Sequence, residues 1–184
     1  MPECSATATR RGGRRRKVAA TAAAALLLSS CLGPDPNLTE SGEGKPEITV
    51  EFPDEAPAGS TQEAIFTVTN PGPGAIDVLA IAFARLGDPK LPQPIVDVAP
   101  RGRRAVLEID PEPRAVSGDG VVYAFGTSEG EVAEPILREG ESLEITFRLT
   151  MPVTPGPAGN SVQAYDGEDV DRARGVRLET EILG

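Results

Sequence analysis

The clearest structural signal in this chain is the stretch LEITFRLTM at residues 143–151. Its odd-numbered residues, from Leu143 to Met151, are all apolar, and its even-numbered residues are all polar or charged. Side chains of a β-strand point alternately to opposite faces, so this period of two predicts a strand with one face in a core and the other in water.

Short segments of similar character recur on both sides of this stretch, with Pro- and Gly-rich turns between them and no amphipathic helical period. Many short strands separated by turn residues are typical of an antiparallel β-sandwich or barrel. The five phenylalanines are spread one to a strand, which favours an all-β sandwich of about 7–9 strands, because both sheets of a sandwich supply side chains to the core. The predicted strands are 48–52, 62–70, 76–86, 105–109, 121–125, 143–151, 161–165 and 176–182, with an edge strand at 95–98.

The pattern also predicts which side chains of these strands face the core and where loops lie. Ala105, Leu107 and Ile109 are expected to face the core, because they alternate with other residues of their strand. Residues 76–86 are apolar on both faces, which indicates a central strand. Residues 53–59 and 152–159 are rich in turn residues and are expected to form loops.

Several turn and strand motifs also carry a family resemblance. The stretch FTVTNPGP at residues 66–73 resembles the opening of bacterial Ig-like surface domains of the conserved-repeat and adhesion-related types. EGES at 139–142, Met151-Pro152, Pro155-Gly156 and Asn160 agree with that pattern. The resemblance covers most of residues 46–184. It implies an Ig-like sandwich of the kind used as a spacer or adhesive module, although this chain has one copy where such proteins usually have several.

The N-terminus reads as an export signal. Six basic residues between Arg10 and Lys17 precede an apolar run at 18–28, which is followed by the small residues Ser29 and Ser30. A basic region, a short apolar region and a small-residue cleavage site are the parts of a secretory signal peptide. The apolar run is shorter than the roughly 20 residues that a spanning helix needs.

The cleavage region resembles a known motif. Leu28-Ser29-Ser30-Cys31 is similar to the lipobox of bacterial lipoproteins. The resemblance implies cleavage before Cys31, a diacylglyceryl group on its thiol and, in many bacteria, a further acyl chain on its amine. Several acyl chains, of the palmitate kind, would anchor the protein stably in a membrane.

This reading divides the chain into a signal peptide (1–30), a flexible tether (31–46) and the Ig-like domain (47–184). The expected location is the bacterial cell envelope, at the outer membrane or the outer face of the cytoplasmic membrane. Leu32 favours outer-membrane sorting, because an aspartate at that position commonly retains lipoproteins of Gram-negative bacteria in the inner membrane.

Composition narrows the function further. The chain has 18 basic and 28 acidic residues, of which residues 1–30 hold 6 and 1, so the mature part has 12 and 27 and a net charge of −15. Such a surface repels nucleic acid, so no nucleic-acid partner is predicted. There is no histidine, one cysteine leaves with the signal and the other carries lipid. The usual general base and the usual zinc ligands are therefore missing, and we expect no enzymatic activity, no cofactor and no catalytic or metal-ligating residue.

Three charged clusters are candidate sites. The run DGEDVD at 166–171 is densely acidic and offers carboxylates for a calcium ion, but it lacks the EF-hand spacing. Asp110, Glu112 and Asp119 form a second acidic region, and residues 101–104 form a basic island (RGRR) in an acidic protein. Solvated loops are the simpler interpretation of all three.

The function expected from the sequence is therefore a lipid-anchored, non-enzymatic domain with a binding or structural role in adhesion or in interaction with an envelope protein. Its partners would be the membrane, through Cys31, and an envelope protein or extracellular polymer that binds loop tips or an exposed sheet edge. The alternative is a calcium-dependent or carbohydrate-binding module that uses the 166–171 loop.

The lipid anchor gives the first testable prediction. Wild-type protein expressed in a bacterial host should enter the detergent phase on detergent phase partitioning, and the Cys31→Ala variant should stay in the aqueous phase, because it has no thiol to acylate. Recovery of both proteins from the aqueous phase would show that Cys31 carries no lipid.

Overall fold

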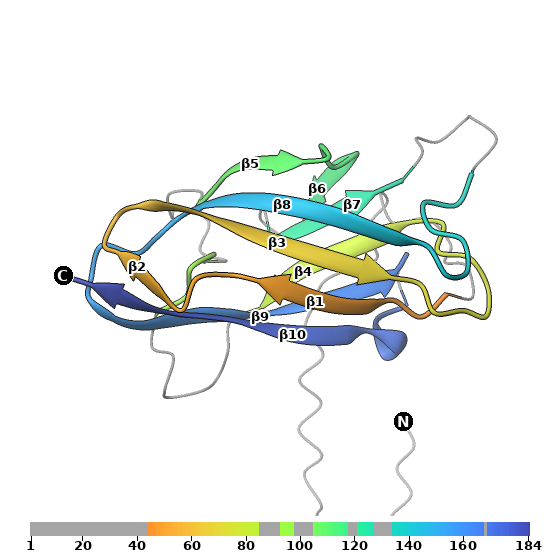
Figure 1. The fold of residues 1–184 in the computed structure, drawn as a ribbon. Helices are drawn as coiled ribbons and strands as arrows, with labels where there is room; N and C mark the ends of the chain where they lie inside the picture. Colours follow the sequence, from red (N-terminus) through yellow and green to blue (C-terminus); the bar gives the residue numbers. More distant parts are fainter. Residues whose placement is uncertain (1–43, 85–92, 98–104, 118–120, 127–133, 168) are drawn as a thin grey trace, which may run out of the picture. The chain divides into compact units, whose positions relative to one another are not determined.

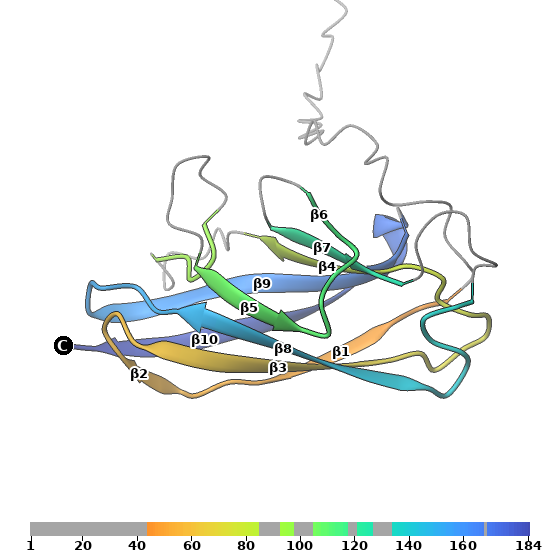
Figure 2. The ribbon, with the colours of Figure 1, turned by 90° about the horizontal axis from the view of Figure 1, so that it is seen from above.

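The computed structural model describes residues 44–84, 93–97, 105–117, 121–126, 134–167 and 169–184 (Figure 1). The chain divides into two compact units, Met1–Cys31 and Leu32–Gly184, and all described residues belong to the second. Two β-sheets lie face to face in this unit, as Figures 1 and 2 show. Within the described residues, no helix combines the length and apolar character needed to cross a membrane.

The first sheet has four strands in the order β1-β3-β8-β5, all antiparallel to their neighbours. Its strands are β1 (Glu47–Glu51), β3 (Thr61–Thr69), β8 (Ser142–Thr150) and β5 (Val106–Asp110). The second sheet has six strands in the order β2-β10-β9-β4-β7-β6, and β2 is parallel to β10. Its strands are β2 (Glu55–Pro57), β10 (Arg174–Leu183), β9 (Gly156–Asp166), β4 (Leu79–Ala84), β7 (Val122–Phe125) and β6 (Ala115–Ser117). A single 3-10 turn, η1 (Val170–Arg172), precedes β10.

The all-β sandwich predicted from the sequence is confirmed. Its strand order is that of an Ig-like domain of the variable type, in which a four-stranded A-B-E-D sheet packs on a G-F-C sheet extended by C′ and C″. Here β1-β3-β8-β5 occupy the first set of positions and β10-β9-β4-β7-β6 the second. The connectivity differs from that of a variable domain. After β4 the chain forms β5 at the D position, then β6 at C″ and then β7 at C′, whereas a variable domain forms C′, C″ and D in that sequence.

The alternation in β8 has the predicted consequence. Ile145, Phe147 and Leu149 are fully buried, while Glu144 and Arg148 are exposed. Phe147 lies in a group of four aromatic rings with Phe66 of β3, Phe83 of β4 and Tyr123 of β7. Five pairs of these rings are in contact, with centroids 5.1–6.0 Å apart, and each of the five meets edge to face, the geometry that aromatic quadrupoles favour. This group joins the two sheets at the centre of the core.

Two buried asparagines fasten loops to the sandwich. The Asn160 side chain is fully buried, and its Oδ1 accepts hydrogen bonds from the N–H groups of Ile95 (3.0 Å) and Val96 (2.8 Å). Its Nδ2 donates to the carbonyls of Ala84 (3.2 Å) and Val96 (2.9 Å). One carboxamide thus satisfies three backbone groups of residues 95–96 and the carbonyl of Ala84 at the end of β4.

Asn70 does the same at the end of β3. It is fully buried, and its Nδ2 donates to the carbonyls of Gly74 (2.9 Å) and Leu137 (3.2 Å). Its Oδ1 accepts from the N–H of Gly72 (3.1 Å), where a positive φ of 81° suits glycine. The Val-Thr-Asn end of β3 and the Gly-rich turn after it, both part of the family resemblance, are therefore held together by a single side chain.

Some local predictions were wrong. Leu107 is 57% exposed, because the pairing of β5 with β8 shifts by one residue between Val106 and Glu108 and this bulge turns Leu107 away from the core. Residues 95–97 form no strand; the nearest pairing is an isolated bridge from Gln93 to Ala158.

Two segments predicted as loops contain strands. β2 lies within 53–59, and β9 begins at Gly156, because both pair with β10. β4 is central as predicted, and side chains on both of its faces, such as Leu79 and Ala80, are buried.

The role of Asn160 can be measured directly. Asn160→Ala should lower the free energy of unfolding by about 3 kcal/mol or more, because it removes four hydrogen bonds, three of them to buried backbone groups of Ile95 and Val96. Gln163→Ala, at an exposed position of the same strand, is the matched control and should change stability by less than about 0.5 kcal/mol. Chemical denaturation checks both, and equal effects of the two substitutions would contradict the role assigned to Asn160.

Candidate functional site

The most distinctive surface feature of the domain is a cleft between β5 and β6. These two strands are terminal strands of opposite sheets. The four residues 111–114 join them and carry the chain from one sheet to the other (Figure 2). The open side of the sandwich therefore lies between two strand edges that have no strand partner in the described part of the chain.

The cleft has a volume of about 530 Å³ and a mixed lining, in which apolar side chains lie beside two glutamates and a tyrosine. The eight side chains that line it are Val106, Leu107, Glu108, Ile109, Glu112, Pro113, Val116 and Tyr123. Leu107 and Val116 are 57% and 49% exposed. They are two of only five large apolar side chains that are exposed among the described residues.

Each exposed side chain has a structural cause. Leu107 is the bulged residue of β5, and a bulge redirects the side chain at the point where it interrupts the ladder. Val116 pairs with Tyr123 of β7 and shares its core-facing side, but β6 is the last strand of its sheet. Its side chain consequently lies at the margin of the core.

The floor of the cleft is the core itself. Tyr123 is 4% exposed and belongs to the central aromatic group, with its ring centroid 5.1 Å from that of Phe147 and 6.0 Å from that of Phe83. A side chain placed between Leu107 and Val116 would contact a ring that packs directly against both sheets.

The charges of the cleft are acidic. Glu108 is held by Arg148 of β8, whose guanidinium donates to its carboxylate at 2.6 Å. The side chain of Glu112, in contrast, has no hydrogen-bond or ion-pair partner among the described residues. No basic residue is among the described residues that line the cleft, and Glu112 contributes an exposed negative charge at its rim.

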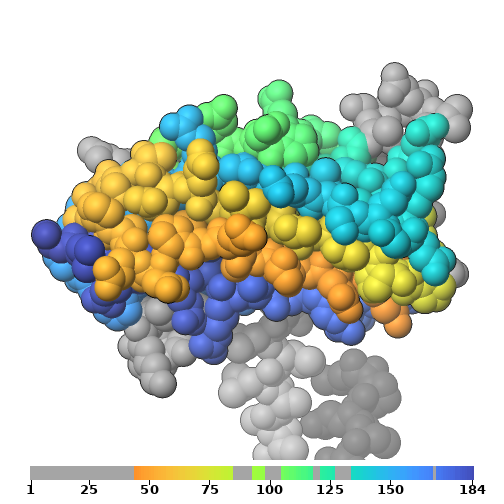
Figure 3. All heavy atoms as spheres, in the orientation of Figure 1, coloured from red at the N-terminus to blue at the C-terminus, as the bar shows by residue number. Residues whose placement is uncertain are grey.

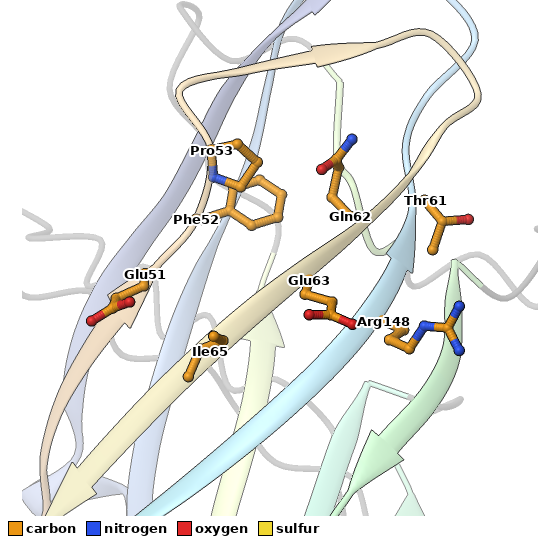
Figure 4. A pocket seen from close by; sticks show the side chains of 8 residues that line it. All are labelled: Glu51, Phe52, Pro53, Thr61, Gln62, Glu63, Ile65 and Arg148. Atoms are coloured by element: carbon orange, nitrogen blue, oxygen red, sulfur yellow. The ribbon is translucent and has the colours of Figure 1, made fainter.

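A second hollow, of about 640 Å³, lies on the outer face of the four-stranded sheet (Figure 4). Figure 3 shows the molecule from the side on which β1 (orange) and β3 (yellow) are visible. Five of the eight side chains that line this second hollow are polar or charged: Glu51, Thr61, Gln62, Glu63 and Arg148. Its apolar members, Phe52, Pro53 and Ile65, are all half-buried. No side chain that lines this hollow is among the large exposed apolar residues, whereas the cleft holds Leu107 and Val116, so the cleft is the stronger candidate for binding.

In the acidic run at 166–171, Asp166 and Asp169 each bind a different partner, and Glu168 lies outside the described residues. Asp166 is 1% exposed and faces inward, where its Oδ1 accepts hydrogen bonds from the N–H groups of Asp77 (3.2 Å) and Val78 (3.4 Å). Asp169 forms an ion pair with Arg172 at 3.0 Å. No group of three potential metal-ligating side chains converges within the described part of the chain. Asp166 therefore acts in this structure as a fastener of the 77–78 segment.

Burial raises the pKa of Asp166 from 3.8 to about 6, and the backbone N–H groups of Val78, Asp77 and Gly44 oppose that rise only in part. The nearby Asp77 carboxylate raises the pKa further. The second carboxylate oxygen of Asp166, Oδ2, is buried without a hydrogen-bond partner, which fits a group that is easier to bury when protonated.

The other predicted site residues fall outside the described residues. These are the lipid attachment residue Cys31, the cleavage motif Leu28-Ser29-Ser30, the basic island at 101–104 and Asp119. Asp110 and Glu112 are described, and Glu112 lies in the cleft.

Comparison with known proteins gives distant similarities. No family model matches the chain, and no curated protein matches it. A β-glucosidase from Listeria innocua is similar over 77% of this chain at 16% identity with a TM-score of 0.37, and the chain spans only 16% of that enzyme. The CARDB domain of a Pyrococcus furiosus protein, solved in complex with di-metal ions, has 13% identity and a TM-score of 0.42, covering 81% of this chain and 97% of that one. A PapD-like domain of human CEP192 has 14% identity and a TM-score of 0.37, covering 76% and 84%.

The raised pKa of Asp166 gives a prediction with a definite sign. A folded-state pKa near 6, above the unfolded value of 3.8, means that the folded state binds the proton more tightly. The stability from this proton is present in full below about pH 3.8 and is lost as the pH rises through 6. Lowering the pH from 7.5 to 5 should therefore increase the free energy of unfolding by about 1 kcal/mol through this group.

The Asp166→Asn variant isolates this contribution. It keeps an oxygen acceptor for the two N–H groups but cannot titrate, so it should lack the increment. All other carboxylates are common to both proteins, and the difference between their pH profiles, measured by urea denaturation, reports Asp166 alone. Parallel profiles would contradict the assignment.

Proposed function

We propose that the mature chain is a lipid-anchored, non-enzymatic binding domain of the bacterial cell envelope, and that it holds another envelope polypeptide in the cleft between β5 and β6. The anchor rests on the resemblance of Leu28-Ser29-Ser30-Cys31 to a lipobox. The non-enzymatic character rests on the absence of histidine from the chain and on a mature part with no free thiol.

The observation that carries the binding role is the exposure of two large apolar side chains, Leu107 and Val116, in one cleft. Water contact of large apolar side chains is unfavourable by about 25 cal/mol per Å², and grouped exposure on an otherwise polar domain marks interaction sites. The cleft is also bounded by two strand edges, where a partner can add backbone hydrogen bonds to apolar contacts.

The position of the cleft suits an anchored protein. The tether joins the domain at β1, where Gly44 donates a hydrogen bond to the carbonyl of Ala75 (3.1 Å) and Pro46 is buried. β1 and β5 are the two opposite edges of the four-stranded sheet, about 14 Å apart at three strand spacings. The attachment point and the cleft therefore lie at opposite edges of the four-stranded sheet.

Site-specific photo-crosslinking in the native cell tests this role. A photoreactive phenylalanine analogue at position 107 should give a discrete higher-mass adduct, because a partner in the cleft contacts that side chain. The same analogue at Val153, which is 74% exposed and outside the cleft, is the matched control and should give none.

Adding Val116→Asp should abolish the adduct at position 107, since a charge in the cleft opposes apolar contact. The proposal is wrong if position 107 gives no adduct, or if both positions give the same products.

A further inference from the structure

The shape and charge of the cleft indicate what kind of segment it receives. We infer that its partner is an extended, strand-like peptide segment in which apolar side chains alternate with lysine or arginine. This inference rests on the proposed function, because it names the partner class of the same site.

The shape of the cleft favours an extended occupant. Its walls are two short strands, five residues of β5 and three of β6, each with one unpaired edge. At about 3.3 Å per residue, β5 offers an edge some 16 Å long, which matches four or five residues of an added strand. Side chains of a strand alternate in direction, so every second residue of the partner would point to Leu107, Val116 and the Tyr123 ring, and the residues between them would point to the rim.

The charge at the rim of the cleft indicates which partner residues would point toward the rim. Glu112 has no partner among the described residues, and the cleft has no basic side chain. Glu108 is already neutralised by Arg148 at 2.6 Å. A cation of the partner beside Glu112 would form an ion pair with this carboxylate, whereas an acidic partner would be repelled by it. A second copy of the chain is disfavoured for the same reason, since two mature chains of net charge −15 repel one another.

Synthetic peptides of eight residues provide the probes. One alternates lysine and valine, a second alternates glutamate and valine, and a third alternates lysine and serine. The third measures attraction of a basic peptide to an acidic protein without apolar contact. Binding to the mature chain carrying Cys31→Ala is followed by the backbone amide chemical shifts of Leu107 and Val116 in NMR titrations.

The lysine–valine peptide should bind at least tenfold more tightly than either of the others and should shift the amides of β5 and β6. Its advantage over the glutamate–valine peptide should shrink in about 1 M salt, where the Debye length is ~3 Å. Glu112→Lys should reverse the order of the lysine–valine and glutamate–valine peptides. Val116→Asp should weaken the lysine–valine peptide at least tenfold, and the control Val153→Asp should leave it unchanged.

Equal binding of the lysine–valine and glutamate–valine peptides, an unchanged order in Glu112→Lys, or shifts confined to other strands would overturn the inference. Shifts of the cleft amides with protein concentration alone would also overturn it and would indicate a second copy as occupant. Crosslinking at position 107 without any peptide preference would leave the proposed function standing while the partner class falls. Peptide preference without crosslinking would instead count against the proposed function.

Discussion

The contact between Phe147 and the rings of Phe83 and Tyr123 is the interaction on which the rest of the domain depends. Phe147 belongs to the four-stranded sheet and the other two rings to the six-stranded sheet, with centroids 5.2 and 5.1 Å from it. Large aromatic side chains contribute most of the apolar area of a small core. Because the chain has no tryptophan, this group of rings provides the main packing contact between the two sheets. Tyr123 also lines the cleft, at the side where the two sheets separate.

The loops depend on a second device. No disulfide is described in the domain, so the segments between strands are held by buried polar side chains. Asn70, Asn160 and Asp166 each bind backbone groups of a neighbouring segment. A carboxamide satisfies donors and acceptors together and stays neutral, whereas the carboxylate of Asp166 must be desolvated, which is why its pKa rises to about 6. Asparagine therefore binds buried backbone groups at a lower desolvation cost than aspartate, and Asp166 is the position where stability becomes sensitive to pH.

The sequence predicted the fold wherever local pattern and tertiary structure agree. The alternation at 143–151 and 176–182 placed Phe147 and Leu178 in the core, where both are fully buried. It failed where pairing overrides pattern. β2 and the start of β9 are poor strand sequences, with Pro57, Gly156 and Pro157, and they are strands because β10 pairs with them. Ala105, Val106 and Leu107, around the start of β5, are three adjacent apolar residues, and a regular strand cannot direct all three side chains to one face. The bulge resolves this conflict by exposing Leu107.

That same conflict explains why the cleft escaped prediction, and it bears on what the cleft is for. Terminal strands are usually protected by charge, proline or bulges, because free strand edges invite aggregation. β5 has all three devices, with Glu108, the following Pro111 and its bulge. Protection alone, however, would place a polar residue at the bulge. Leucine at that position, in one cleft with Val116 and the core residue Tyr123, exposes apolar surface where a protected edge would hide it. In the proposed function, the acidic residues of the rim oppose unspecific pairing of the edge and admit a partner of opposite charge.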